Sequence, residues 1–170
     1  PHMSAVYPAV RKKLTVEGFH ALVDAGVLGE DDRIELIEGE MIEMAPIGGK
    51  HMGVVNRLNR LLVDAVGDRG VVSVPTPIAL PPHSEPQPDF TVLTPGSDTI
   101  ERDIPRADAV LLLVEVSDTT LGYDRQTKLP LYARHGIPEV WIVDGAARRI
   151  EIHRQPTGDG YAERGVASAR

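Results

Sequence analysis

Cysteine is absent from the 170-residue chain, so the sequence provides no disulfide, no thiolate metal site and no cysteine nucleophile. Aromatic residues make up only 4% of the chain, which leaves little material for the stacking platforms of single-strand binders. No apolar run approaches the roughly 20 residues of a membrane helix, and no signal peptide is visible. These absences predict a protein without a membrane partner, located in the cytoplasm.

Positive charge is also in short supply: 18 Lys and Arg residues stand against 25 Asp and Glu residues, for a formal net charge of -7. Such a chain has no general electrostatic attraction to nucleic acid or to an anionic membrane, so any contact with either must be local. The composition, 42% hydrophobic and 25% charged, is typical of a globular domain. We expect one domain over residues 4–170, after a start at residues 1–3 (PHM) that resembles a cloning remnant.

Three segments have features of helices. The first begins with Thr15 as a candidate N-cap, shows apolar residues at helical intervals and stops near Gly26. The second covers residues 50–66, where apolar residues recur every three or four positions. The third covers residues 124–136, in which Pro130 must either kink the helix or lie in its first turn.

The apolar runs between these segments have the pattern of β-strands. They predict a hairpin at residues 34–43, two short proline-punctuated segments at 71–80, strands at 90–94 and 109–116, and a second hairpin at 138–154. The run at 109–116 is nearly continuous in Val and Leu, as in a strand covered on both faces, and is therefore expected at the centre. The last residues show no pattern. The fold class predicted is α/β, with a mixed, partly parallel sheet flanked by helices.

Two acidic residues stand where strands would favour apolar ones. Asp89 opens one predicted strand behind two prolines, and Glu115 interrupts the run "VLLLVEV". The chain between them is long enough for a strand and a return strand alongside it, so the two carboxylates could meet. Desolvating a carboxylate is costly unless a cation compensates it, and a divalent metal compensates two at once. Hard oxygen ligands suit Mg²⁺ or Mn²⁺ rather than zinc.

Lys128 lies in the segment that follows the strand of Glu115 and could bring a positive charge to the same place. A metal held by two carboxylates beside a lysine is what phosphodiester hydrolysis needs. Other interpretations remain open at this point. Asp89 could be a local cap, Glu115 could form a structural ion pair with an arginine such as Arg125, and Glu35 could belong to the solvated face of its hairpin.

An ordered set of motifs resembles a known family. "RIELIEGEMIEM" is followed by "PQPDFTVL", by "LLLVEVSDTT" and by "YDRQTKLPLYARHGIPEVWIVD", all within residues 14–154. This set resembles the Uma family of restriction-endonuclease-like proteins, in the PD-(D/E)XK nuclease superfamily. The resemblance implies a restriction endonuclease-like core, hydrolysis of DNA phosphodiester bonds and dependence on Mg²⁺ or Mn²⁺.

The same resemblance implies roles for individual residues. Asp89 and Glu115 would be metal ligands, with the backbone carbonyl of Val116 as a third. Glu35 would match the additional acid that helps to position the metal or its water. Ser117 occupies the place where the superfamily motif has its lysine, and Lys128 matches a relocated position for that lysine. His51, at the start of the second predicted helix, could contact a phosphate or ligate metal, although a lone histidine is more often a surface or capping residue.

The acidic net charge supports an alternative to catalysis, a nuclease-like binding or interaction module with weak or no activity. A basic patch beside the carboxylates would distinguish DNA cleavage from this alternative. The candidates for such a patch are Arg11, Lys12, Lys13, Lys50, Arg57 and Arg125. Hydrolysis of another phosphate ester would instead require a closed pocket. The predicted edge strands make a homodimer feasible, and a dimer could cut both strands of a duplex.

Overall fold

A computed structural model describes residues 10–29, 31–97 and 104–168 of the chain. Its main strands are β3 (Val71–Ser73), β4 (Phe90–Leu93), β5 (Val110–Ser117), β6 (Glu139–Asp144), β7 (Arg149–Thr157) and β8 (Gly160–Ser168). These form one six-stranded sheet in the order β3-β4-β5-β6-β7-β8. Only β5 and β6 run parallel, and the other neighbours are antiparallel, so the sheet is mixed as predicted.

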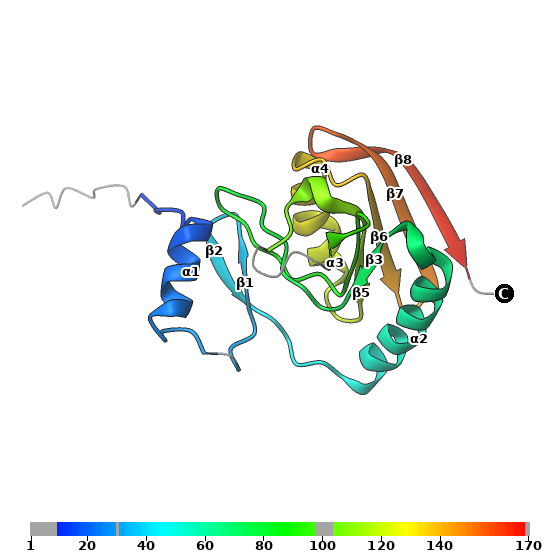
Figure 1. Cartoon of the computed structure of the whole chain (residues 1–170), viewed down its shortest axis with the longest axis horizontal. Helices are drawn as coiled ribbons and strands as arrows, with labels where there is room; N and C mark the ends of the chain where they lie inside the picture. Colours follow the sequence, from blue (N-terminus) through cyan, green and yellow to red (C-terminus); the bar gives the residue numbers. More distant parts are fainter. Residues whose placement is uncertain (1–9, 30, 98–103, 169–170) are drawn as a thin grey trace, which may run out of the picture.

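The remaining elements flank this sheet (Figure 1). They are α1 (Val16–Asp24), β1 (Ile34–Ile37), β2 (Glu40–Glu43), α2 (Gly49–Val66), η1 (Gly67–Arg69), η3 (Ala107–Ala109), α3 (Leu121–Tyr123), η4 (Asp124–Lys128) and α4 (Leu129–Arg134). The antiparallel pair β1-β2 is a sheet of its own, covered by α1 and set to one side of the main sheet in Figure 1.

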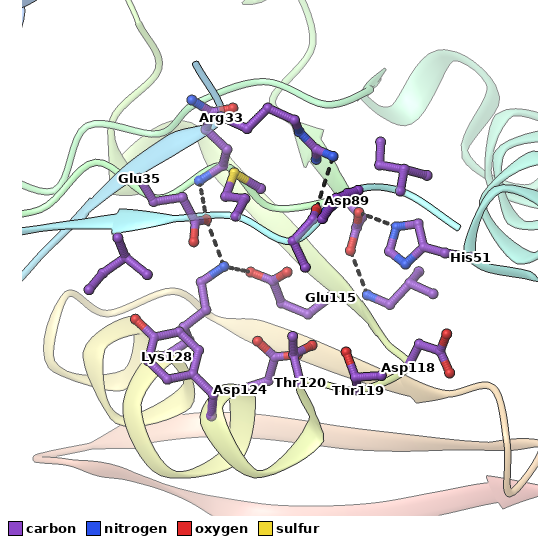
Figure 2. Close-up of a pocket in the computed structure, with 18 of the residues that line it drawn as sticks. Arg33, Glu35, His51, Asp89, Glu115, Asp118, Thr119, Thr120, Asp124 and Lys128 are labelled. Atoms are coloured by element: carbon purple, nitrogen blue, oxygen red, sulfur yellow. Dashed lines mark hydrogen bonds and ion pairs between the residues drawn. The ribbon is translucent and has the colours of Figure 1, made fainter. Parts of the chain in front are cut away.

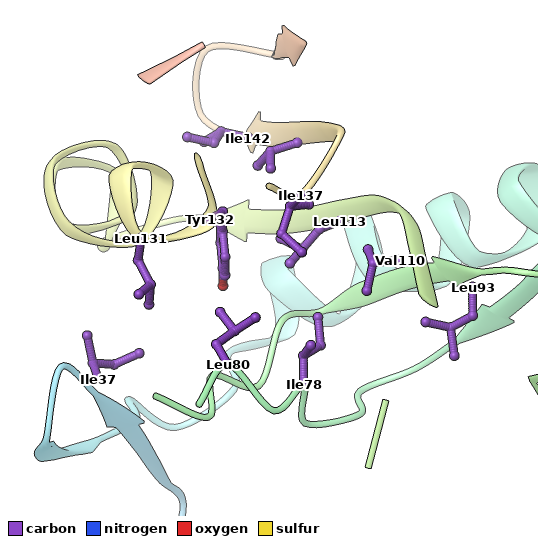
Figure 3. Close-up of a cluster of buried hydrophobic side chains, with 11 residues drawn as sticks. Ile37, Ile78, Leu80, Leu93, Val110, Leu113, Leu131, Tyr132, Ile137 and Ile142 are labelled. Atoms are coloured by element: carbon purple, nitrogen blue, oxygen red, sulfur yellow. The ribbon is translucent and has the colours of Figure 1, made fainter. Parts of the chain in front are cut away.

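Alternation along β5 decides what each face of the sheet contacts. Leu112, Val114 and Val116 pack with α2 on one face, in a cluster that includes Leu58 and Leu62. Leu113 points to the opposite face and belongs to the cluster that contains α4, shown in Figure 3. Because side chains alternate in a strand, Glu115 faces the α4 side together with Leu113. The central position predicted for this strand is confirmed.

The three predicted helices are present. Thr15 is the N-cap of α1, and its side chain accepts a hydrogen bond from the Gly18 backbone N–H at 3.0 Å. Helix α2 spans almost the predicted range. The third segment is a continuous helical run in which α3 leads into a π-helical turn, η4, and then into α4. Pro130 lies in the first turn of α4, which is one of the two positions predicted for it.

Two predictions about strands are wrong. Of the two segments expected at residues 71–80, only β3 is a strand, because Ala79 and Leu80 make isolated bridges instead of a ladder. Prolines at positions 75, 77 and 81 remove the donors that a second ladder would need. The chain end, where the sequence shows no pattern and no strand was expected, forms β8 along β7. Most of β8 is exposed on both faces, so it carries no apolar alternation for the sequence to reveal.

Candidate active site

The pairing of β4 with β5 brings the two unusual acids together. Phe90 lies opposite Val114 in this antiparallel pair, which places Asp89, one residue before β4, at the level of Glu115. Strand β1 contributes Glu35 from the neighbouring hairpin. The π-helical turn η4 contributes Lys128, and all four side chains line one pocket of about 320 Å³ (Figure 2).

Both carboxylate oxygens of Asp89 have partners in the protein. Oδ2 accepts a hydrogen bond of 2.7 Å from the backbone N–H of Val116, so the carboxylate reaches across to β5. Oδ1 lies 2.9 Å from Nε2 of His51, which comes from the first turn of α2. The pairing with β5 shows that Asp89 is more than a local cap. His51 also lines the pocket, and its partner there is this carboxylate.

Lys128 joins two acids that are distant in sequence. Its Nζ lies 2.8 Å from Oε1 of Glu35 and 2.8 Å from Oε1 of Glu115. All three residues are buried, with relative exposures of 4%, 5% and 4% for Glu35, Glu115 and Lys128. The solvated interpretation of Glu35 is therefore wrong. The ion pair suggested between Glu115 and Arg125 is also wrong, because Arg125 pairs with Glu151 on β7.

Negative charge exceeds positive charge in this cluster. Burial raises the pKa of Glu115 to about 8; Lys128 opposes this rise, while Asp124, Asp89 and Glu35 add to it. Burial alone would lower the pKa of Lys128, but Glu115 and Glu35 outweigh burial and raise it above its ordinary 10.5. Lys128 is therefore a firmly protonated cation among several carboxylates.

Sequence reasoning missed the buried carboxylate of Asp124. Its Oδ2 accepts hydrogen bonds from the hydroxyls of Ser117 at 2.5 Å and of Thr120 at 2.9 Å. Burial raises the pKa of this carboxyl, and the two hydroxyls and Lys128 partly offset that rise. Ser117 thus ties the end of β5 to the π-helical turn that carries Lys128. The sequence does contain a signal for Asp124. It precedes Lys128 by four positions in a predicted helix, and residues four apart lie on the same helix face.

A second missed residue is Arg33, just before β1, which lines the pocket. Its guanidinium donates a hydrogen bond of 3.1 Å to the carbonyl of Ala45 and extends over the Asp89 side of the pocket in Figure 2. Among the described residues, Arg33 forms no ion pair with any carboxylate. It is therefore a cation available to an anionic ligand.

The basic residues expected beside the carboxylates do not line this pocket. Arg11 lies 3.8 Å from Glu40, and Lys13 lies 3.6 Å from Glu38, so both are paired on the exposed side of the β1-β2 hairpin. Arg125 is paired with Glu151, as described above. The predicted patch is thus replaced at the pocket itself by Arg33 and Lys128.

The oxygen donors able to hold a hard metal ion are the carboxylates of Asp89 and Glu115, with Val116 on the same wall of the pocket. Within residues 10–29, 31–97 and 104–168, no set of three or more His, Cys, Asp or Glu side chains is arranged to hold a metal ion. Mg²⁺ does not demand such a set, since it commonly binds through one or two carboxylates and keeps several waters.

None of the helices in the described part of the chain combines the length and the apolar character of a membrane span.

Comparison with known proteins gives a family and a fold. The model of the Uma2 family, described as "Putative restriction endonuclease", matches residues 16–169. The chain is similar in fold to a crystal structure described as "a putative nuclease belonging to DUF820", from Anabaena variabilis ATCC 29413. The TM-score is 0.67 over 92% of this chain and 85% of that chain, at 18% sequence identity. No functionally curated protein matches the chain.

Proposed function

This chain belongs to the Uma2 family, as its ordered motifs predicted, and we propose that it is a metal-dependent endonuclease that hydrolyses phosphodiester bonds of DNA. The proposal rests on the convergence of Glu35, Asp89, Glu115 and Lys128 in one pocket. Burying such charges contributes little to stability, because desolvation offsets their attraction. Clusters of buried groups with perturbed pKa values are characteristic of sites that do chemistry.

The residues of the pocket fit a hard divalent cation such as Mg²⁺ or Mn²⁺. Glu35, Asp89, Glu115 and Asp124 bring four carboxylates to a place where Lys128 is the buried cation. A divalent ion would balance the remaining negative charge. Asp89, Glu115 and the carbonyl of Val116 would hold this ion, with Glu35 nearby. When bound, such an ion makes a water more acidic and stabilises charge that develops on the phosphate.

Lys128 would act as a charge and a hydrogen-bond donor. Because its pKa is raised, the ammonium keeps its proton near neutral pH and is not a general base. It holds Glu35 and Glu115 at 2.8 Å each, and we propose that it also orients the attacking water or stabilises charge on the phosphate. His51 would hold Asp89 in place through its 2.9 Å contact.

Arg33 supports a phosphate-bearing substrate. It is the pocket-lining arginine, and no carboxylate of the described residues neutralises it. A guanidinium matches the geometry of phosphate oxygens and stays charged at every relevant pH. Cutting both strands of a duplex would require two sites, and the outer edge of β8 offers a surface through which two copies could pair.

A second candidate function is that of a nuclease-like binding or interaction module with weak or no catalysis. The net charge of -7 and the absence of the expected basic residues from the pocket walls favour this alternative. The two functions differ in one respect that can be measured. Only metal-dependent cleavage is expected to require the carboxylate groups of Asp89 and Glu115.

The test is cleavage of supercoiled plasmid in Mg²⁺ or Mn²⁺, with EDTA as the metal-free control. We compare the wild type with Asp89→Asn and Glu115→Gln, which keep the size of each side chain and remove its charge. The matched control is Asp64→Asn, at an exposed aspartate of α2 outside the pocket. We expect metal-dependent nicking by the wild type and by Asp64→Asn, and its loss in both site variants.

Binding is measured in parallel with labelled DNA, with Ca²⁺ in place of Mg²⁺ or Mn²⁺. Metal-dependent nicking that survives in both Asp89→Asn and Glu115→Gln would refute catalysis at this pocket. DNA binding without nicking by the wild type would favour the binding module. A wild-type protein that neither binds nor nicks DNA would argue against DNA as the substrate.

A further inference from the structure

The two oxygens of the Glu115 carboxylate have different surroundings. Oε1 accepts a hydrogen bond of 2.5 Å from the hydroxyl of Tyr132 and also lies 2.8 Å from Nζ of Lys128. Oε2 receives no hydrogen bond from any residue that the structure describes. Figure 2 shows this second oxygen turned toward the side of the pocket where Asp89 lies.

Tyr132 reaches Glu115 from behind the pocket. It belongs to α4, is completely buried and packs in the apolar cluster drawn in Figure 3. It is not among the residues that line the pocket, so it does not touch a ligand bound there. A buried tyrosine hydroxyl needs a hydrogen-bond partner, and Glu115 is the partner that the structure gives it.

A carboxylate held by one donor can still rotate about its last side-chain bond. Two donors on the same oxygen, one from η4 and one from α4, leave the carboxylate with a defined plane. The ring of Tyr132 cannot shift to follow a rotating carboxylate, because the core packs around it. The arrangement therefore fixes the direction in which Oε2 points.

We propose that Tyr132 is a positioning residue that, together with Lys128, holds Oε1 of Glu115 so that Oε2 is presented to a divalent cation between Glu115 and Asp89. This inference rests on the proposed metal-dependent function and adds a residue to it. Outer partners that orient metal-binding side chains are general features of metal sites, and their loss commonly weakens metal affinity by about 10-fold to 100-fold.

The first test measures Mn²⁺ affinity without DNA, by calorimetry and by the electron paramagnetic resonance signal of free Mn²⁺. The variant is Tyr132→Phe, which removes only the hydroxyl. The matched control is Tyr161→Phe, since the Tyr161 hydroxyl also donates one hydrogen bond, of 2.7 Å to the carbonyl of Ile137, and its ring packs against the same cluster. Unfolding midpoints of both variants are measured alongside.

We expect Tyr132→Phe to bind Mn²⁺ about 10-fold more weakly than the wild type, and Tyr161→Phe to bind within about twofold of it. Equal affinity in Tyr132→Phe and wild type would overturn the inference and leave the proposed metal site standing. Equal losses in both variants would also overturn it, since they would reflect core packing alone. No Mn²⁺ binding by the wild type would overturn both the inference and the metal-dependent function.

The second test uses the wild type and so does not depend on how any variant folds. Tyrosine is labelled with ¹³C at Cζ, the atom that carries the hydroxyl, and Mg²⁺ is titrated in. The Cζ signal of Tyr132 should move, because metal binding to Glu115 changes the hydrogen bond that its hydroxyl makes. The signal of Tyr161 should stay in place. A Tyr132 signal that stays in place while Mg²⁺ binds would overturn the inference.

Discussion

The stability of the metal-free protein should fall as pH rises from about 5 to about 8, and Glu115 should cause a large part of that fall. Burial raises the pKa of this carboxyl from its ordinary 4.5 to about 8 in the folded state. The folded protein therefore holds a proton that the unfolded chain releases. The resulting stabilisation is complete below pH 4.5 and is lost as pH rises through about 8.

The size of the effect follows from the interval between the two pKa values. From 4.5 to about 8 is about 3.5 pH units, at about 1.4 kcal/mol each, which gives an upper limit of ~5 kcal/mol. Folded domains are stable by only about 5–15 kcal/mol, so such a change is measurable. Lys128 adds no slope in this window, because its pKa starts at 10.5 and is raised further. Burial also raises the pKa of Asp124 and Glu85, which leaves a residual slope.

The measurement is urea denaturation in EDTA at several pH values, followed by circular dichroism. Glu115→Gln imitates the protonated acid, so its stability should match the wild type near pH 5 and exceed it near pH 8. The control is Glu40→Gln, at an exposed glutamate of β2, which should keep the wild-type slope. Parallel stability curves for Glu115→Gln and the wild type would refute the argument that burial holds a proton on Glu115.

Three further predictions concern other parts of the molecule. Lys128→Met should destabilise the protein by about 3–5 kcal/mol near neutral pH, because the buried carboxylate of Glu35 and the carboxyl group of Glu115 lose the cation between them; an unchanged urea midpoint would contradict this. Arg33→Ala should weaken DNA binding in Ca²⁺ and lower the salt slope of affinity by about one, whereas Arg33→Lys should retain most of that slope; equal slopes in all three proteins would exclude a phosphate contact. Gly39→Ala should be more destabilising than Gly26→Ala in thermal melts, since both glycines have positive φ but a β-carbon at Gly39 would stand 2.5 Å from Cβ of Lys13, and nothing lies within 4 Å at Gly26. Equal melting temperatures of the two glycine variants would show that the backbone conformation alone matters.

Part of the site could be found from the sequence because burying an acid is costly. Glu115 stands out in a run of Val and Leu, and Asp89 stands out behind two prolines. The length of chain between them allows their strands to be neighbours, and the pairing of β4 with β5 makes them so. Lys128 was expected nearby from its position after the strand of Glu115, the family motifs added Glu35, and the fold places both in the same pocket.

Other members of the site leave no local signal. Arg33 resembles any exposed arginine in the sequence, and its importance lies in lining the pocket without a carboxylate partner among the described residues. Tyr132 reads as one apolar residue of a helix, and only the packing of α4 against β5 brings its hydroxyl to Glu115. Strand β8 was missed for a related reason, since an exposed strand carries no periodic apolar pattern.

The helices, most strands and the identity of the unusual acids could be predicted from the sequence. These depend on periodicity and composition within one segment, where each residue reports whether it faces apolar core or water. Which charged groups meet depends on the tertiary structure. Lys128 and Glu35 are 93 positions apart in the chain, and their contact depends on how the β1-β2 hairpin docks beside the π-helical turn. No local pattern encodes such a contact, because its free energy arises from burying several charged groups together.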